Sequence, residues 1–438
     1  MKKLWRKTLI TNNKAQTVLI RGEKMTSIVK QRIEQIRCGE VPEGYKKTKA
    51  GVIPSEWELR PLSKHLTESR IPGTNGAIAK KLTVKLWNKG VFEKREVHEG
   101  SESTTYYKRK SGQLIYSKLD FLNCAFGIIP DHLNDYESTQ DLPCFDISNV
   151  DPYYLLTYVT QRNFYTHFGM IADGGRKARR VGPEDMLSFP LIYPSLPEQE
   201  KITEILSAQD KLIALKEKLI EEKKRQKKAL MQQLLTGKKR VPGFSGEWVD
   251  VKLGDIFAER VETNCQSLEL LSVTGTNGVV PRSTIETKDN SSEDKSKYLK
   301  ICKGDIGYNT MRMWQGVSAL SDYEGIVSPA YTILVPSEKI SAKYFSYLFK
   351  MHAVIFLFYR FSQGIVDDTR SLKYHEFAKL HHNVPSDKCE QEAIAKILTV
   401  SDKELEILQR DLDQEKQKKK ALMQLLLTGI VRTAKEDT

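Results

Sequence analysis

The chain has 438 residues and a formal net charge of +13, and 39% of its residues are hydrophobic. This length allows two or three domains, and the excess of basic residues favours nucleic acid as a partner, although solvated lysine faces produce the same charge. No apolar stretch approaches the ~20 residues of a membrane span, and the N-terminus lacks the apolar run of a signal peptide. The sequence therefore predicts a cytoplasmic protein. Its six cysteines are scattered without a CxxC pair, which indicates reduced thiols and neither a zinc site nor a disulfide framework.

Residues 1–43 form an N-terminal extension that contains one short predicted helix. The apolar residues of this helix lie on one side of it: Ile28, Val29, Ile33 and Ile36. The helix ends near Gly39, and Val-Pro and Glu-Trp then follow in the same order that they follow Gly237. We interpret the short helix as the remnant of a third helix end that precedes the first globular domain.

Two globular segments follow, at 44–197 and 238–389, and both mix short β-type runs with helical stretches. They correspond in outline but poorly residue by residue. The passages that align are 56–57 with 247–248, 111–116 with 303–308, 143–145 with 329–331, and 194–195 with 385–386. This divergence predicts two copies of one scaffold that carry two different surfaces.

A long helix follows each globular segment, and the two helices are the clearest repeat in the chain. Residues 198–237 recur at 390–429 with a constant offset of 192, and 11 of the 14 positions from 224 to 237 match their counterparts. A period near 190 is too long for a solenoid unit, which runs about 20–50 residues. The repeat therefore indicates a duplicated domain plus helix.

Leucine and isoleucine recur along both helices at heptad-like spacing. They are Leu206, Ile213, Ile220, Leu230 and Leu234 in the first copy, and Leu398, Leu405, Leu408, Leu412, Leu422 and Leu426 in the second. Each helix is marginal alone, so we expect the two copies to pair antiparallel within the chain as a rod of ~60 Å. The lysine-rich stretches 223–228 and 416–420 would then face solvent or a partner.

These elements predict a mixed α+β protein with two globular domains, two long antiparallel coiled-coil helices and an internal pseudo-two-fold repeat. The predicted segments are an extension at 1–43, domains at 44–197 and 238–389, helices at 198–237 and 390–429, and a tail at 430–438.

No catalytic apparatus is evident in the sequence. Gly237-Lys238 lacks the preceding glycine of a phosphate-binding loop. Asp151-Pro-Tyr-Tyr154 is only partly similar to an adenine-methyltransferase motif and follows no glycine-rich cofactor loop. His375 and His381 are six residues apart, so they do not share a helix face as zinc ligands would. We therefore expect no catalytic residue, no metal site and no cofactor in this chain.

Residues suited to contact with DNA are present in both domains. In the first they are Lys118, Asn123 and the basic loop residues Arg176, Lys177, Arg179 and Arg180; in the second they are Asn277, Arg282, Asn309, Arg312, Trp314, Gln315 and Arg370. Arginine and lysine suit phosphates, arginine, asparagine and glutamine can read base edges, and tryptophan can pack on a sugar or base. Asn309 and Trp314 are equally compatible with turn and core roles.

Residues 44–438 resemble the specificity (S) subunits of Type I restriction-modification systems. The strings that carry the resemblance are GYKKTKAGVIP at 44–54 with Glu56-Trp57, YSKLDFLN at 116–123, LPEQE at 196–200, DIGYNTMRMWQG at 305–316, and the repeated KKALMQ tail that ends in Leu-Thr-Gly. The extension 1–43 is longer than the pattern of that family requires.

The resemblance implies that each globular domain is a target recognition domain for one half of a bipartite, asymmetric double-stranded DNA site. It implies that the helices are spacers that set the half-site separation and dock the modification (methyltransferase) subunits. Methylation and ATP-driven restriction and translocation would then belong to partner subunits, which would hold AdoMet, ATP and Mg²⁺. The segments 116–123 and 308–315 are the best candidates for base reading.

Two other functions remain open at this level. A coiled-coil adaptor that bridges two protein partners would show no salt-dependent DNA binding, whereas a DNA reader would lose affinity steeply with salt. A nuclease or methyltransferase with a degenerate site would yield product from DNA when AdoMet or Mg²⁺ is added to the purified chain.

Overall fold

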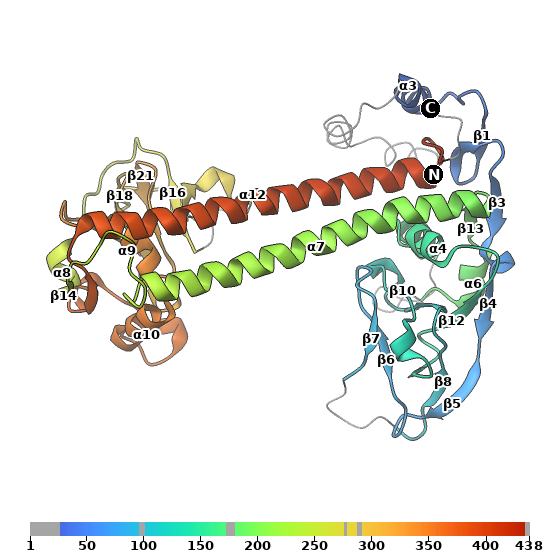
Figure 1. Cartoon of the computed structure of the whole chain (residues 1–438), viewed down its shortest axis with the longest axis horizontal. Helices are drawn as coiled ribbons and strands as arrows, with labels where there is room; N and C mark the ends of the chain where they lie inside the picture. The colour runs from blue at the N-terminus through green and yellow to red at the C-terminus, as the bar shows by residue number, and fades with distance from the viewer. Residues whose placement is uncertain (1–26, 96–100, 172–179, 276–277, 287–290, 434–438) are drawn as a thin grey trace. The chain divides into compact units, whose positions relative to one another are not determined.

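The computed structural model describes residues 27–95, 101–171, 180–275, 278–286 and 291–433. Two compact units divide the chain (Figure 1): unit 1 comprises 1–216 and 411–438, and unit 2 comprises 217–410. Both long helices, α7 (Leu196–Leu234) and α12 (Lys388–Leu427), run without interruption from one unit into the other. The predicted mixed α+β class is confirmed, with one globular domain in each unit.

The centre of unit 1 is a four-stranded antiparallel sheet in the order β10-β9-β12-β4. Its strands are β4 (Leu66–Ser69), β9 (Leu114–Tyr116), β10 (Phe126–Ile128) and β12 (Cys144–Ile147). Smaller sheets pair β3 (Glu58–Pro61) with β13 (Pro190–Tyr193), β1 (Tyr45–Thr48) with β2 (Gly51–Pro54), β6 (Leu82–Val84) with β7 (Val91–Glu93), and β8 (Thr105–Lys108) with β5 (Ile71–Asn75) and β11 (Glu137–Ser138). The helices are α3 (Ser27–Cys38), α4 (Pro152–Val159), α5 (Arg162–Phe168) and α6 (Pro183–Ser188).

Unit 2 repeats this plan with a sheet in the order β20-β19-β22-β15. The strands are β15 (Phe257–Glu259), β19 (Ile306–Asn309), β20 (Ser318–Leu320) and β22 (Tyr331–Pro336). The pairs are β14 (Trp248–Lys252) with β23 (His381–Pro385), β16 (Leu271–Thr274) with β17 (Gly278–Pro281), and β18 (Leu299–Ile301) with β21 (Gly325–Val327). The helices are α8 (Leu253–Ile256), α9 (Ala342–Leu348), α10 (His352–Phe361) and α11 (Tyr374–Phe377).

Strand register refines the alignment of the two domains. Ile115 in β9 pairs with Cys144, and Gly307 in β19 pairs with Ile333. Because Ile115 and Gly307 are equivalent, Cys144 corresponds to Ile333. The predicted alignment of 143–145 with 329–331 is therefore wrong by three residues.

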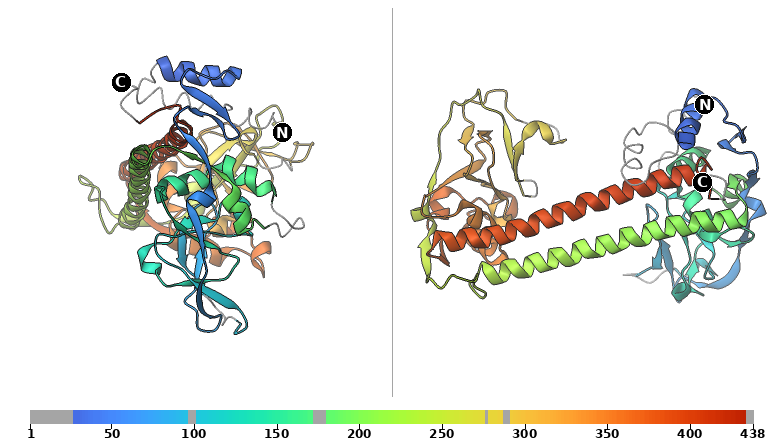
Figure 2. Two further views of the ribbon diagram at one scale, coloured as in Figure 1. Left: turned by 90° about the vertical axis from the view of Figure 1, so that its right-hand side faces the viewer. Right: turned by 45° about the horizontal axis from the view of Figure 1, so that its top comes forward.

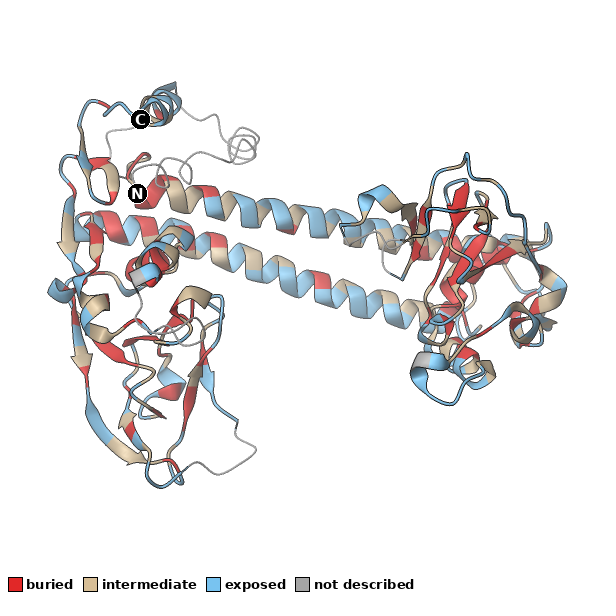
Figure 3. Cartoon of the chain, turned by 180° about the vertical axis from the view of Figure 1, so that it is seen from behind, coloured by how far each residue is buried: buried red, intermediate tan, exposed pale blue. Residues whose placement is uncertain are grey.

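Buried apolar residues recur every 14 residues along the two long helices, as a heptad pattern predicts. They are Leu206, Ile220 and Leu234 in α7, and Leu398, Leu412 and Leu426 in α12. Figure 3 shows such buried residues at intervals along both helices, with exposed residues between them.

Each unit holds an antiparallel pairing of α7 with α12. In unit 1, Gln209 Nε2 donates to Glu415 Oε2 at 2.7 Å, whereas Lys216, further along α7, pairs with the earlier residue Asp411 of α12. In unit 2, Lys223 pairs with Glu404. Lysines of the basic stretches therefore bind across the helix pair, which differs from the expectation that they all face solvent or a partner.

The N-terminus of each long helix is joined to its own domain by a buried glutamine. In unit 1, Gln199 Nε2 donates to Pro194 O at 2.9 Å, and its Oε1 accepts from Asp151 N at 3.0 Å. Asp151 in turn caps α4, since its carboxylate accepts from Tyr154 N at 2.7 Å. The residue that begins the methyltransferase-like string is thus a helix N-cap.

Gln391 makes the same connection in unit 2, with Pro385 O and Ser341 N, both at 2.9 Å. Ser341 is the N-cap of α9. The two domains therefore hold their helices through one repeated set of hydrogen bonds.

An arginine that follows each long helix pairs with a glutamate at the start of the other one. Arg432 binds Glu198 in unit 1 through its Nε at 2.8 Å and its Nη2 at 3.2 Å. Arg240 binds Glu390 in unit 2 with two contacts of 2.7 Å. Both glutamates are buried. This repeated ion pair secures the C-terminal end of one helix beside the N-terminus of the other within each unit.

Helix α3 lies against the C-terminal end of α12 (Figure 2), where Val29 packs with Leu425 and Ile430. Arg32 Nη1 donates to Ile430 O at 3.2 Å. Among the described residues, no helix is long and apolar enough to cross a membrane.

Candidate nucleic-acid interface

The loop between β19 and β20 carries three of the predicted contact residues of unit 2, Arg312, Trp314 and Gln315, and a fourth, Asn309, is the last residue of β19. Asn309 Oδ1 accepts from Met311 N at 3.0 Å, which turns the chain out of β19. The loop contains a short 3-10 helix, η6 (Met313–Gln315), and ends at Gly316 with φ of +78°. Glycine suits position 316 because side chains of L-residues rarely adopt this positive φ.

Lys350 supports this loop from below. Its Nζ donates to Gly316 O at 2.7 Å and to Ser318 O at 2.6 Å. Burial lowers the pKa of Lys350 to about 8. The loop is therefore fixed by its contact with α10 and by Lys350, which lies between α9 and α10, and it presents its outer residues in a defined position.

Trp314 and Arg370, which are 56 positions apart in the sequence, meet through Tyr359 of α10. The Trp314 ring lies edge-on to Tyr359 with 6.1 Å between centroids. The Arg370 guanidinium lies 4.1 Å from the Tyr359 ring centroid, and its Nη2 donates to the Tyr359 hydroxyl at 3.0 Å. Phe356, which is 55% exposed, stacks on Tyr359. The structure thus forms one aromatic and basic surface, which we call the Trp314–Tyr359 face.

Arg312 and Gln315 lie in the same loop as Trp314 and are exposed. Their side chains make no hydrogen bond or ion pair within the described part of the chain. Arg360, at the end of α10, is exposed as well. These side chains remain available for contact with phosphates and base edges, as the sequence predicts for Arg312 and Gln315.

Asn309 and Arg282 both lie near Tyr331, at another point of the domain. Asn309 pairs with Tyr331 across β19 and β22. Burial raises the pKa of the Tyr331 hydroxyl, while bonding to Val273 O, bonding to Asn309 and the nearby charge of Arg282 act in the opposite direction. Asn309 is therefore a turn residue as well as a neighbour of Tyr331. Asn277 lies outside the described residues.

The equivalent loop of unit 1 connects β9 with β10 and has a different composition. Asp120 occupies the position of Arg312, and Leu122 that of Trp314. Asp120 binds its own loop: its Oδ1 accepts from Asn123 Nδ2 at 3.1 Å, and Ser117 Oγ donates to its Oδ2 at 3.2 Å. The predicted base reader Asn123 therefore has one local bond, and it remains half-buried.

Of the remaining predicted residues of unit 1, Lys118 lies in this loop and Arg180 lies close to it. Lys118 is half-buried, and its carbonyl accepts from Val181 N at 3.2 Å. Arg180 is exposed and lies 3.9 Å from Asp141. The structure thus places the end of the basic loop next to Lys118. Arg176, Lys177 and Arg179 lie outside the described residues.

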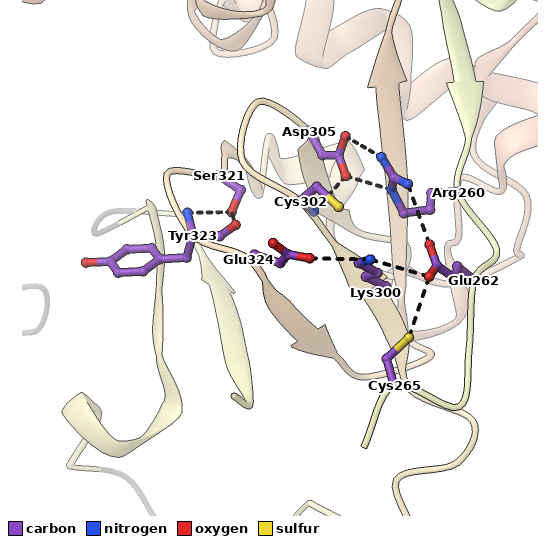
Figure 4. A network of polar contacts seen from close by, with 9 residues as sticks. All are labelled: Arg260, Glu262, Cys265, Lys300, Cys302, Asp305, Ser321, Tyr323 and Glu324. Atoms are coloured by element: carbon purple, nitrogen blue, oxygen red, sulfur yellow. Dashed lines mark hydrogen bonds and ion pairs between the residues drawn. The ribbon is translucent and has the colours of Figure 1, made fainter. Parts of the chain in front are cut away.

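The end of β19 away from the loop carries a separate polar network (Figure 4). Arg260 binds the buried Asp305 carboxylate at 2.8 and 3.2 Å, and Asp305 accepts from Cys302 N at 2.8 Å. Lys300 pairs with Glu262 at 3.4 Å and Glu324 at 3.3 Å. These groups satisfy one another, so the network supports the sheet. Within the described residues no group of three or more His, Cys, Asp or Glu side chains is placed to hold a metal ion.

Sequence reasoning missed Phe356, Tyr359 and Arg360. A usable signal exists in α10, whose buried residues are Val354 and Phe358. At 100° per residue, aromatic residues at 356 and 359 fall on another side of this helix. An apolar segment with aromatics outside its buried stripe indicates a surface with a partner.

The fold and these loops define a class of duplicated two-domain proteins, in which a shared framework carries two different contact surfaces. The family description "Type I restriction modification DNA specificity domain" matches residues 144–225 and 245–415, more than half of the chain. The protein belongs to this family.

The chain is also similar to individual proteins. The MjaX type I restriction enzyme specificity subunit of Methanocaldococcus jannaschii, a putative assignment in that organism, is 23% identical over 436 residues, which cover 89% of this chain and 97% of that protein. A chain in a solved structure of a type I R-M system has a TM-score of 0.53 and 15% identity, with 86% of this chain and 98% of that chain covered, and shares the fold. The S subunit from M. genitalium has a TM-score of 0.49 and 12% identity, with coverage of 84% and 96%.

Proposed function

We propose that this chain is the sequence-recognition subunit of a Type I restriction-modification complex. Each domain reads one half of a bipartite, asymmetric DNA site, through the loop that follows β9 in unit 1 and the loop that follows β19 in unit 2. The helices dock the modification subunits and set the distance between the half-sites. Methyl transfer and ATP-driven restriction belong to the partner subunits, which hold AdoMet, ATP and Mg²⁺.

One observation carries the proposal: the two domains share their internal connections and differ in their loops. The bonds of Gln199 recur at Gln391. In contrast, Asp120 stands where unit 2 has Arg312. A carboxylate can accept from cytosine, whereas a guanidinium donates to guanine or a phosphate. Two loops of different composition on one framework suit two different half-sites.

The helices suit a docking role because they repeat an exposed apolar residue. Leu215 of α7 is 65% exposed, and its counterpart 192 positions later, Ile407 of α12, is 58% exposed. Equivalent apolar positions on two copies of one helix favour two copies of one partner. With 39 residues, α7 is about 58 Å long. If removal of one turn from both helices left the recognised spacer unchanged, this measuring role would be refuted.

Methylation mapping of the host genome tests the function. A host that expresses the modification subunits with this chain should methylate a two-part motif, and the motif should lose methylation when the chain is removed. Asn123→Ala should relax one half of the motif and Gln315→Ala the other half. Unchanged methylation without the chain would refute the proposal.

Salt dependence separates this function from a protein-bridging adaptor. Arg312→Gln should weaken binding to any duplex and lower the magnitude of the salt slope by about 1 if Arg312 contacts a phosphate. Val261→Ala is a control in unit 2, because Val261 is 68% exposed and lies between Arg260 and Glu262 at the other end of the domain. An adaptor would show no salt-dependent DNA binding in any variant.

A further inference from the structure

We propose that the loop 363–371 of unit 2 is an apolar wedge that inserts Ile365 between base pairs of the half-site read by that unit. This inference rests on the proposed function, since it requires DNA on the Trp314–Tyr359 face. It adds a deformation of the duplex to the contacts with base edges.

The loop has a closed and defined conformation. Gln363 N donates to Ser371 O at 2.9 Å, and Ser371 N donates to Gln363 O at 2.7 Å. Inside this closure, Thr369 N donates to Val366 O at 2.9 Å, and Val366 N donates to Thr369 Oγ1 at 3.3 Å. These bonds connect both sides of the loop, so its tip is held in place before any ligand binds.

Ile365 stands at the tip and is 97% exposed, while the adjacent Val366 is 57% exposed. Gly364 before it has φ of +129°, and a Cβ at 364 would approach Thr369 O to 2.6 Å. Only glycine fits this path closely. The backbone is thus bent tightly beneath Ile365. This bend directs an aliphatic side chain into solvent, where it gains no burial.

The base of the loop is attached to the Trp314–Tyr359 face. Arg370 Nε donates to Asp367 Oδ1 at 3.0 Å, and Arg370 also bonds to the Tyr359 hydroxyl. The pairing with Arg370 neutralises Asp367, the acidic residue nearest to Val366. Ile365 is therefore presented beside the surface on which we place the DNA.

The surroundings favour nucleic acid over other occupants. Trp314 and Phe356 provide aromatic surface, and Arg312 and Arg360 are exposed basic residues on the loop and helix around them. Basic residues can hold the phosphates on both sides of a step while an aliphatic side chain separates the bases, as in proteins that kink DNA by insertion of isoleucine or leucine. A fixed tip lowers the entropic cost of that insertion.

The sequence of unit 1 lacks this device. Glycines 174 and 175 occupy the positions of Ile365 and Val366, when Arg179 is aligned with Arg370. The inference therefore predicts distortion in one half-site only, the half whose recognition changes in Gln315→Ala.

Fluorescence of 2-aminopurine measures the insertion directly, because the base brightens when it is unstacked. The probe is a duplex that carries the motif found by methylation mapping, with 2-aminopurine placed in turn at each adenine position of both half-sites. The full chain should raise the fluorescence several-fold at one step of the unit 2 half-site. Ile365→Ala should abolish that rise and lower affinity about tenfold, whereas Ile365→Met should retain most of both.

Gly364→Ala provides a second test, because it keeps Ile365 but forces the backbone beneath it to move. The increase in 2-aminopurine fluorescence should be smaller in this variant as well. Val261→Ala, an exposed aliphatic truncation at the other end of the domain, should match the wild type. Equal fluorescence and affinity for Ile365→Ala and wild type would overturn the wedge. Normal DNA binding with weakened association of the modification subunits would overturn it too, and would assign Ile365 to a protein contact. Absence of any mapped motif would instead remove the proposed function itself.

Discussion

The buried glutamines at the starts of α7 and α12 provide the sharpest test of the repeated framework. Gln199 is fully buried, and its amide satisfies one carbonyl and one backbone N–H. Gln199→Leu replaces the amide by an apolar group of similar size, and it leaves Asp151 N and Pro194 O without this partner. Each buried polar group left without a partner costs about 1–3 kcal/mol. Partial relaxation should reduce the total, so we expect unit 1 to lose about 3 kcal/mol of stability.

Native-state hydrogen exchange is the appropriate assay, because the two units need not unfold together. In Gln199→Leu the amides of α4 and of residues 190–199 should exchange faster, and those of unit 2 should be unchanged. Gln391→Leu should give the reverse pattern in α9 and 381–391. Gln233→Leu is the matched control, since Gln233 is exposed on α7. Changes below about 0.5 kcal/mol in both buried variants, which is the range of ordinary surface substitutions, would refute this account of how the helices are held.

Two other contacts and the reactivity of the cysteines can be tested separately. Arg432→Met leaves the buried Glu198 carboxylate with the indole Nε1 of Trp57, at 2.9 Å, as its side-chain donor; it should destabilise unit 1 by about 2–3 kcal/mol and speed exchange over 423–432, and unchanged protection there would contradict it. Burial lowers the pKa of Lys350 to about 8 from 10.5, so between pH 8 and 10.5 the unfolded chain binds the proton more often than the folded one. The contribution of Lys350 to the free energy of unfolding should therefore increase with pH in that window. Denaturant titrations at several pH values should show that this increase is absent in Lys350→Met. Burial raises the pKa of Cys124 and of Cys144 to about 12; mass spectrometry after iodoacetamide treatment at pH 8 should find Cys38 and Cys389, which are exposed, modified first, and early labelling of Cys144 would contradict the structure.

The repeat was predictable because helix periodicity survives in sequence. Leu206 and Ile220 in α7, like Leu398 and Leu412 in α12, recur at multiples of seven residues and are buried, so a pairing of the two helices could be expected from the residues alone. The loop segments 116–123 and 308–315 could also be located, because their strings YSKLDFLN and YNTMRMWQ carry the resemblance to the specificity subunits. These signals are local, and local signals can be read from a chain.

The composition of the Trp314–Tyr359 face could not be predicted in the same way. Arg370 joins Trp314 only because α10 places Tyr359 between them. That meeting depends on the packing of α10 on the sheet, which involves residues far apart in the sequence. Asn309 shows the converse problem: its turn role and its contact role were both open, and the structure shows the turn bond to Met311 without excluding contact with DNA.

The ends of α3, α7 and α12 share one glycine turn. Gly39, Gly237 and Gly429 all have positive φ, at +89°, +71° and +70°, and each donates its N–H to the carbonyl three residues earlier. The end of α7 packs Gly237 against Trp248, and the end of α12 packs Gly429 against Trp57. In sequence order α3 precedes Trp57 as α7 precedes Trp248. The glycine that packs against Trp57 is nevertheless Gly429, at the end of α12, and not Gly39, at the end of α3.

Helix α3 instead packs against the C-terminal end of α12. Its Val29 packs on Leu425 and Ile430, and Tyr45 of the following strand donates to Gly429 O at 2.7 Å. The last turn of α12 is thereby held between Trp57 and α3. In unit 2 the corresponding end of α7 is joined to its domain covalently and needs no such cover, whereas the end of α12 is held in unit 1 only by contacts. Helix α3 thus holds the end of α12 in unit 1, where chain continuity holds the end of α7 in unit 2.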